Sequence, residues 1–231
     1  MSGKRTTTWA SAAVLVVLLV LGYFLTRYQE DNPPTTGQPP TAGQSPTAGQ
    51  PPVAPGEAAD RLAALRIAPE GKMAGYSRDR FPHWSGQGNS CDTREVVLQK
   101  QGADVRTDKD CKATAGSWVS PYDGVTITEA GKLDIDHTVP LAEAWRSGAD
   151  KWTDEQRQKF ANDLGGSQLL AVSATTNRAK GDQDPAKWKP PVEAYWCAYA
   201  TNWVSVKAAY DLTADQAEHD ALAAMLGTCP R

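Results

Sequence analysis

The segment LDIDHTVPL, residues 133–141, decides the fold predicted for this chain. Its alternating apolar and acidic residues predict a short strand that ends at His137, and Pro140 breaks the strand pattern just beyond it. Further along, residues 169–182 have the sequence LLAVSATTNRAKGD. There an apolar run predicts a buried strand, and a short helix is expected over residues 175–180, with Asn177 near its start. Each segment alone is a weak signal, but together they bring an acidic strand end to an asparagine at a helix start.

These side chains match the needs of phosphodiester hydrolysis: a base for the attacking water, a cation for the developing charge, and donors for the phosphate. His137 suits the general base, because imidazole has an unperturbed pKa near neutrality. Asp136 and the amide oxygen of Asn177 are hard oxygen ligands suited to Mg²⁺, with Mn²⁺ as the alternative. Arg178 and Lys180 are expected to contact the phosphate, and Lys180 and Asn177 to take part in catalysis.

The two segments closely resemble the HNH endonuclease family of exported actinobacterial proteins, which is related to the C-terminal part of GmrSD-type restriction enzymes. Over these segments alone, the chain also resembles the HNH domain of RNA-guided nucleases, which shares the D-H-x-V-P and N-R-x-K patterns. The resemblance to the exported family runs from about Gly75 to Cys229. It implies a ββα-metal (HNH, or His-Me finger) core, with His137 as general base, Asp136 as a metal ligand and Asn177 as the asparagine of the motif.

The chain departs from the common HNH pattern at its third motif residue, a histidine late in the helix, which has no counterpart here. Lys180 and Asp182 occupy that region, so water could complete the coordination of a metal ion. Asp134 is expected either to be an extra metal ligand or to orient His137. Arg94 is expected to reach the phosphate and assist catalysis, and the alternative is a structural salt bridge.

The N-terminal part is predicted to lie outside the folded domain. Residues 1–8 are expected to be a cytoplasmic tail and residues 9–26 a transmembrane anchor, since a nearly unbroken apolar run follows two basic residues. A cleaved signal peptide is the alternative. Residues 31–56, rich in Pro, Thr and Gly, predict a disordered stalk, and residues 57–231 form the predicted nuclease domain. The domain is therefore expected at the cell membrane and facing outward, or secreted if the N-terminal segment is cleaved.

Four cysteines, Cys91, Cys111, Cys197 and Cys229, lie in this exported domain. An even number favours two disulfides, and three pairings are possible. The local pairs, Cys91 with Cys111 and Cys197 with Cys229, are preferred. Each is expected to stabilise the fold by roughly 3 kcal/mol through loop entropy. A zinc site is disfavoured, because the chain has no C-x-x-C pair and only three histidines.

The domain is predicted to be α+β with more helix than strand. Short segments between residues 110 and 136 suit a small antiparallel sheet. Helical spacing and caps predict helices and a closing helical hairpin, in which Pro191 lies in the first turn of one helix and Thr213 caps the other. The remaining helices are expected over residues 57–67, 92–101, 141–148 and 153–164.

The net charge of −3 excludes a strongly basic nucleic-acid binder but allows a local basic patch. We predict a metal-dependent endonuclease that acts on nucleic acid, foremost DNA. It would contact the membrane through its N-terminal helix and act as a monomer without a protein partner. One alternative is a catalytically degenerate HNH-fold binding module displayed at the cell surface, which the missing third motif residue favours. Another is a cell-surface hydrolase that acts on the envelope, although the motifs of such enzymes are absent from the sequence.

Overall fold

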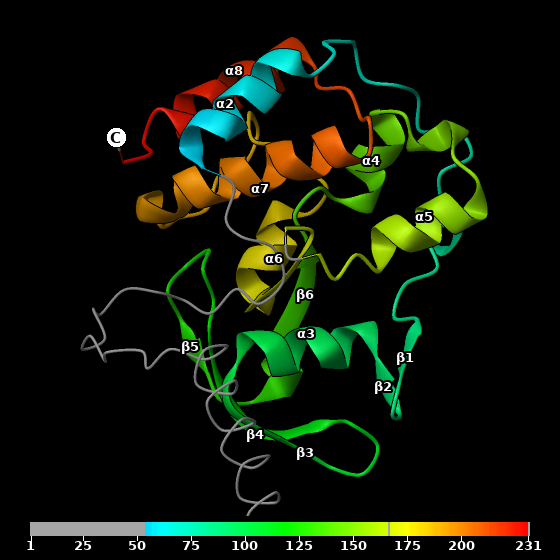
Figure 1. Cartoon of the computed structure of the whole chain (residues 1–231), viewed down its shortest axis with the longest axis vertical. Coiled ribbons are helices and arrows are strands. Elements are labelled where there is room, and N and C mark those ends of the chain that lie inside the picture. The colour runs from blue at the N-terminus through cyan, green and yellow to red at the C-terminus, as the bar shows by residue number, and fades with distance from the viewer. Residues whose placement is uncertain (1–53, 166, 231) are drawn as a thin grey trace, which may run out of the picture. The chain divides into compact units, whose positions relative to one another are not determined.

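The computed structural model describes residues 54–165 and 167–230 (Figure 1). The predicted tail at residues 1–8, the anchor or signal at 9–26, and the stalk as far as residue 53 lie outside these residues. Within the described ranges, no helix has the length and apolar character needed to cross a membrane.

Helices and short strands alternate along the described chain, which confirms the α+β class. The strands are β1 (Gly86–Gly88), β2 (Cys91–Asp92), β3 (Ala103–Thr107), β4 (Ala113–Val119), β5 (Thr126–Ile127), β6 (Leu133–His137) and β7 (Leu169–Ser173). The α-helices are α2 (Pro55–Ala64), α3 (Thr93–Gln101), α4 (Leu141–Arg146), α5 (Asp154–Ala161), α6 (Ala174–Lys180), α7 (Trp196–Ala209) and α8 (Gln216–Leu226).

The strands form separate small antiparallel sheets rather than one. β3, β4 and β5 make a three-stranded sheet, and β1 pairs with β2. β6 was predicted to join the same sheet as the segments before it. Instead it pairs with β7, in register from Leu133 opposite Ser173 to His137 opposite Leu169.

Burial on both faces explains why β6 and β7 form their own pair. Leu169 and Ala171 enter an apolar cluster with Trp118, whereas Leu170 and Val172 enter a second cluster with the aromatic side chains of α7. Successive side chains of a strand point to opposite faces, so one strand can supply two cores. α3 and α6 both pack against this pair (Figure 1). The β6–β7 pair therefore contributes side chains to both apolar clusters of the domain.

β7 leads directly into α6. The Ser173 hydroxyl accepts a hydrogen bond from the Thr176 amide at 3.2 Å and caps the helix. The helix ends at Gly181, whose φ of 57° suits a glycine. Asn177 and Lys180 are three positions apart and therefore lie on one face of α6, and both side chains bond to β6.

Both predicted disulfides are present. Cys91–Cys111 joins β2 to the turn between β3 and β4, with a Cα–Cα distance of 5.1 Å. Cys197–Cys229 joins α7 to the residues after α8, with a Cα–Cα distance of 4.9 Å. The second bond closes the C-terminal helical hairpin.

The starts of the two hairpin helices differ from the prediction. α7 begins at Trp196, after a 3-10 turn over residues 193–195, so Pro191 precedes its first turn. α8 is capped by Asp215 rather than Thr213. The reason is a tertiary contact, since the Thr213 hydroxyl donates to the carbonyl of Ser147 at 3.1 Å.

Candidate active site

A cavity of about 210 Å³ lies at the end of β6. Its lining includes Asp136 and His137 from β6 and Asn177 from the first turns of α6. Tyr76 and Arg78, from the segment before β1, also line it. The rest of the lining comes from Ile135, Pro140, Leu141, Ala142, Gly181 and Asp182. Three of the predicted site residues, from two separate segments, therefore share one cavity.

Asp136 is buried, and two donors hold one of its oxygens. The Tyr122 hydroxyl donates to Oδ2 at 2.5 Å, and the Lys180 ammonium donates to the same oxygen at 2.6 Å. Burial raises the pKa of Asp136, and the charge of Lys180 opposes this rise. Because both donors contact Oδ2, Oδ1 is the oxygen left to face a ligand.

Lys180 was predicted to contact the phosphate, but its side chain is fully buried. Its ammonium is 2.6 Å from Asp136 Oδ2 and donates to the carbonyl of His137 at 2.8 Å. Burial lowers the pKa of Lys180, while the adjacent carboxylate raises it. A buried carboxylate needs a compensating charge. Lys180 is therefore the counter-ion of Asp136 rather than a phosphate contact.

His137 is oriented by a main-chain carbonyl. Its Nε2 is 2.9 Å from the carbonyl oxygen of Ala161, the last residue of α5. Since a carbonyl only accepts, Nε2 carries the hydrogen and Nδ1 of the neutral ring is an acceptor. Burial lowers the pKa of His137 to about 3, against the opposing effect of the Ala161 hydrogen bond. The ring, which stacks on Trp84 at 6.0 Å between centroids, is thus neutral at pH 7, and its pKa lies below the near-neutral value expected from the sequence.

Asn177 is held by Asp134. Its Nδ2 donates to Asp134 Oδ2 at 3.1 Å, which leaves the amide Oδ1 as a free acceptor. Asp134 is not among the described residues that line the cavity. Asp134 therefore orients Asn177, and not His137 as one prediction had it. The side chain of Arg178 is 78% exposed, with its Nε 3.8 Å from Asp134 Oδ2, so it remains accessible to a phosphate.

Arg94 does not join these residues. Its guanidinium donates to the carbonyls of Ala130 and Leu133, both at 3.0 Å. Among the described residues that line the cavity, Arg94 is absent. The predicted phosphate contact is therefore not supported, and neither is the alternative of a salt bridge. Arg94 instead fixes the chain where it enters β6, because those carbonyls flank the start of the strand.

A divalent metal ion fits the donors that the cavity offers. Asp136 Oδ1 and Asn177 Oδ1 are hard oxygen donors, and Mg²⁺ typically binds through one or two carboxylates while keeping several waters. Asp182 also lines the cavity, but Arg146 donates to its Oδ2 at 2.7 Å and to its carbonyl at 2.6 Å. The two open oxygens of Asp136 and Asn177 are therefore the best candidates for protein ligands.

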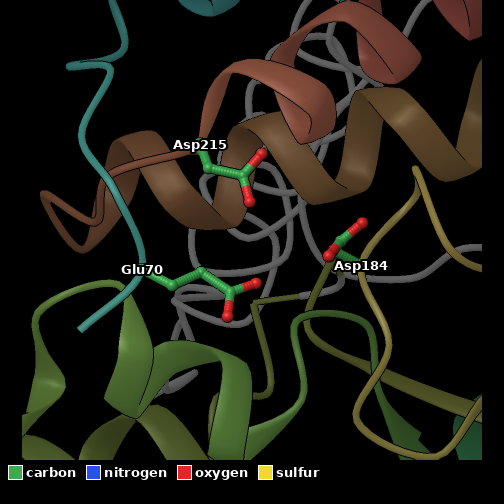
Figure 2. A group of neighbouring side chains, drawn as sticks. All are labelled: Glu70, Asp184 and Asp215. Atoms are coloured by element: carbon green, nitrogen blue, oxygen red, sulfur yellow. The ribbon is translucent and has the colours of Figure 1, made fainter. Parts of the chain in front are cut away.

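A second group of carboxylates does not form a convincing metal site. Glu70, Asp184 and Asp215 surround a shared space, with ligand atoms within 4.8 Å of one another (Figure 2). However, the ammonium of Lys187 is 2.7 Å from Asp184 Oδ2 and 2.8 Å from Glu70 Oε1. Asp215 is also engaged as the cap of α8. The lysine thus supplies the positive charge that a metal ion would bring.

Two residues of the site, Tyr122 and Arg78, were not predicted from the sequence. Tyr122 lies fourteen positions before Asp136, in a turn, and only the tertiary fold brings its hydroxyl to the carboxylate. Arg78 lies in a 3-10 turn far from both motif segments in the sequence, so the pattern that marks the site does not reach it. The local signal is an arginine among the aromatic residues Tyr76, Phe81 and Trp84, which by itself does not indicate a phosphate contact.

Residues 92–225 match a family described as GmrSD restriction endonucleases, C-terminal domain. This chain belongs to that family. The match contains Asp136, His137 and Asn177, so the predicted relation to GmrSD enzymes is confirmed and the chain is placed among nuclease-related proteins. The match begins after Tyr76 and Arg78.

A similar protein comes from Arthroderma benhamiae (strain ATCC MYA-4681 / CBS 112371), where it bears the name "Uncharacterized secreted protein". It is 54% identical over 172 residues, which cover 74% of this chain and 84% of the relative. This relative is fungal rather than actinobacterial. No solved structure matches the chain.

Proposed function

We propose that this protein is a metal-dependent HNH endonuclease that hydrolyses phosphodiester bonds of DNA. One observation carries the proposal: the cavity brings together His137, whose Nε2 is bound by the Ala161 carbonyl, the carboxylate of Asp136 and the amide of Asn177. The antiparallel β6–β7 pair followed by α6 supports an HNH core. Membership of the GmrSD C-terminal family supports a nuclease.

In the proposed reaction, His137 acts as general base. Its Nδ1 takes a proton from a water molecule as the water oxygen bonds to phosphorus. The bond between phosphorus and the 3′ oxygen then breaks, and the departing oxygen takes a proton from solvent. The products are a 5′-phosphate and a 3′-hydroxyl. The carbonyl of Ala161 keeps the ring in the tautomer that this step requires.

Asp136 and Asn177 would hold the divalent cation. When bound, the cation supplies positive charge to the phosphate and the leaving oxygen. Tyr122 and Lys180 position the Asp136 carboxylate, and Asp134 positions the Asn177 amide. Hydrogen-bonded partners of this kind commonly change metal affinity or activity when they are removed.

Two observations support an extracellular site of action. The two disulfides suit an oxidising compartment, where such bonds persist. The 54% identical relative is named a secreted protein. Fractionation of expressing cells, followed by N-terminal sequencing of the protein recovered from membrane and medium, separates an anchored form from a cleaved one.

The test is cleavage by the full-length protein with its cysteines oxidised. Supercoiled plasmid, linear DNA and RNA are each incubated with Mg²⁺, Mn²⁺ or EDTA. We expect nicking of plasmid in Mg²⁺ and none in EDTA. His137→Ala and Asn177→Ala should abolish turnover, because they remove the base and a metal ligand.

His219→Gln is the control, because His219 lies on α8, outside the lining of the cavity. This variant should cleave at the wild-type rate. Wild-type activity in His137→Ala would refute the role of that residue. If the folded wild-type protein binds DNA but cleaves none of the substrates with either metal ion, a catalytically degenerate binding module would be favoured.

A further inference from the structure

The cavity carries one positive charge that the surrounding residues leave uncompensated. Of the charged side chains in its lining, Asp136 is paired with Lys180 at 2.6 Å and Asp182 with Arg146 at 2.7 Å. Arg78 is exposed, and no hydrogen bond or ion pair joins its guanidinium to another described residue. When these two partners are counted with the lining, the charge of Arg78 is the one left unpaired, although the chain as a whole has a net charge of −3.

We propose that Arg78 binds a non-bridging oxygen of the scissile phosphate and so completes the active site from outside the family match. This inference rests on the proposed nuclease function. A guanidinium suits the role, because it stays charged and presents several donors in a plane that matches phosphate geometry. Arg78 is thus a substrate-binding residue that residues 92–225 do not contain.

The position of Arg78 relative to His137 supports this role. Both residues line the same cavity. A cation that lines the same cavity as the proposed base can hold a phosphate while water attacks it.

The segment that carries Arg78 is firmly attached to the domain. Phe81 is fully buried in the core of helices. Arg157 Nε donates to the carbonyl of Arg80 at 3.1 Å, and Asn162 Nδ2 donates to the carbonyl of Pro82 at 2.7 Å. These contacts fix the 3-10 turn Arg78–Arg80 while leaving the Arg78 side chain free. Because the backbone of the turn is already fixed, binding a ligand has to order only the Arg78 side chain, which reduces the entropy lost.

Arg80, two residues further on, does not have this role. Its guanidinium lies over the Trp145 ring, 5.2 Å from the centroid, and the carbonyl of the same residue is bound by Arg157. The lining formed by the described residues includes Arg78 but not Arg80. The two arginines of one turn therefore differ: one packs against the core and the other faces the cavity.

The experiment measures how DNA binding depends on salt. Full-length wild type, Arg78→Ala, Arg78→Lys and Arg66→Ala are titrated with a labelled DNA duplex in EDTA over a range of NaCl concentrations. Arg66→Ala is a matched control, because it removes the same charge as Arg78→Ala from another exposed arginine. Arg66 pairs with Asp211 and does not line the cavity. Plasmid cleavage by the same variants is measured in Mg²⁺.

We expect Arg78→Ala to make the slope of log K against log [NaCl] shallower by about 0.9, as for the loss of one phosphate contact. Cleavage should slow by about tenfold or more, as for the loss of a charged hydrogen bond. Arg78→Lys should keep the wild-type slope and recover part of the cleavage rate, and Arg66→Ala should match wild type.

The salt slope separates failure of this inference from failure of the proposed function. An unchanged slope in Arg78→Ala overturns the phosphate contact, even if wild type cleaves DNA well. A changed slope with no cleavage by wild type keeps the contact but refutes the nuclease. An equal change in Arg66→Ala also overturns the inference, because the effect would then be one of net charge.

Discussion

Replacing Lys180 with methionine should be among the most destabilising single changes in the described domain. The side chains of Lys180 and Asp136 are 0% and 6% exposed, and 2.6 Å separates Nζ from Oδ2. Methionine fills a similar volume but leaves the carboxylate buried without its counter-charge. Breaking a buried ion pair in this way costs about 3–5 kcal/mol. Solvent screening does not reduce this figure, since both groups are buried.

Urea denaturation at pH 7 in EDTA provides the assay, so that no divalent cation can compensate the bare carboxylate. Four proteins form a double-mutant cycle: wild type, Lys180→Met, Asp136→Asn and the double variant. The free energy of unfolding lost in the double variant should be smaller, by about 2 kcal/mol, than the sum of the losses in the two single variants. The reason is that the double variant buries no unpaired charge. Lys132→Met is the control. Lys132 pairs with Glu129 at the same 2.6 Å, but both side chains are about two-thirds exposed, so the loss should stay within about 1 kcal/mol.

Additive losses within about 0.5 kcal/mol would refute the reasoning, because independent sites behave in that way. Equal losses in Lys180→Met and Lys132→Met would refute it as well. In that case burial would not be the source of the effect.

Three further outcomes are expected. Tyr122→Phe removes the 2.5 Å hydrogen bond to Asp136 and should reduce Mg²⁺-dependent plasmid cleavage by about 10-fold or more; unchanged cleavage would show that the hydroxyl does not position the carboxylate. Burial raises the pKa of Glu218 to about 7, above the ordinary value of about 4.5 for a glutamate. Its contribution to stability is therefore complete below pH 4.5 and is lost as the pH rises through 7. Because of this group, the free energy of unfolding should fall as the pH rises from 5 to 8, and Glu218→Gln should lack that fall in denaturation curves. Replacing Cys197 and Cys229 with serine opens a loop with a separation of 32 residues and should cost about 4 kcal/mol in chemical denaturation; a loss under about 1 kcal/mol would refute the loop-entropy estimate.

The elements that form the site could be predicted because their signals are local. Apolar runs marked β6 and β7, and the break at Pro140 marked the end of the first. The approach of Asp136, His137 and Asn177 followed from the paired motif. The capping box that starts α5 at Thr153 was also readable, since all of its partners lie within three residues.

The roles of charged residues could not be predicted in the same way. α6 has only seven residues, too few for a periodic pattern to show which cation is buried. Lys180 faces Asp136 and Arg178 faces solvent, although both looked alike in the sequence. The partners of Arg94 are carbonyls more than thirty residues away, and a sequence pattern does not reveal main-chain acceptors.

The group that orients His137 has a consequence for how this family can diverge. The acceptor is the carbonyl of Ala161, at the C-terminal end of α5, where helix carbonyls otherwise lack partners. No substitution at position 161 deletes a main-chain oxygen. Substitutions at position 161 would therefore report on the burial of the Ala161 methyl group. They would not report on the hydrogen bond between the Ala161 carbonyl and His137. The tautomer of His137 is set by the path of the backbone, so side chains around α5 can change without altering it, as long as the helix ends at the same place.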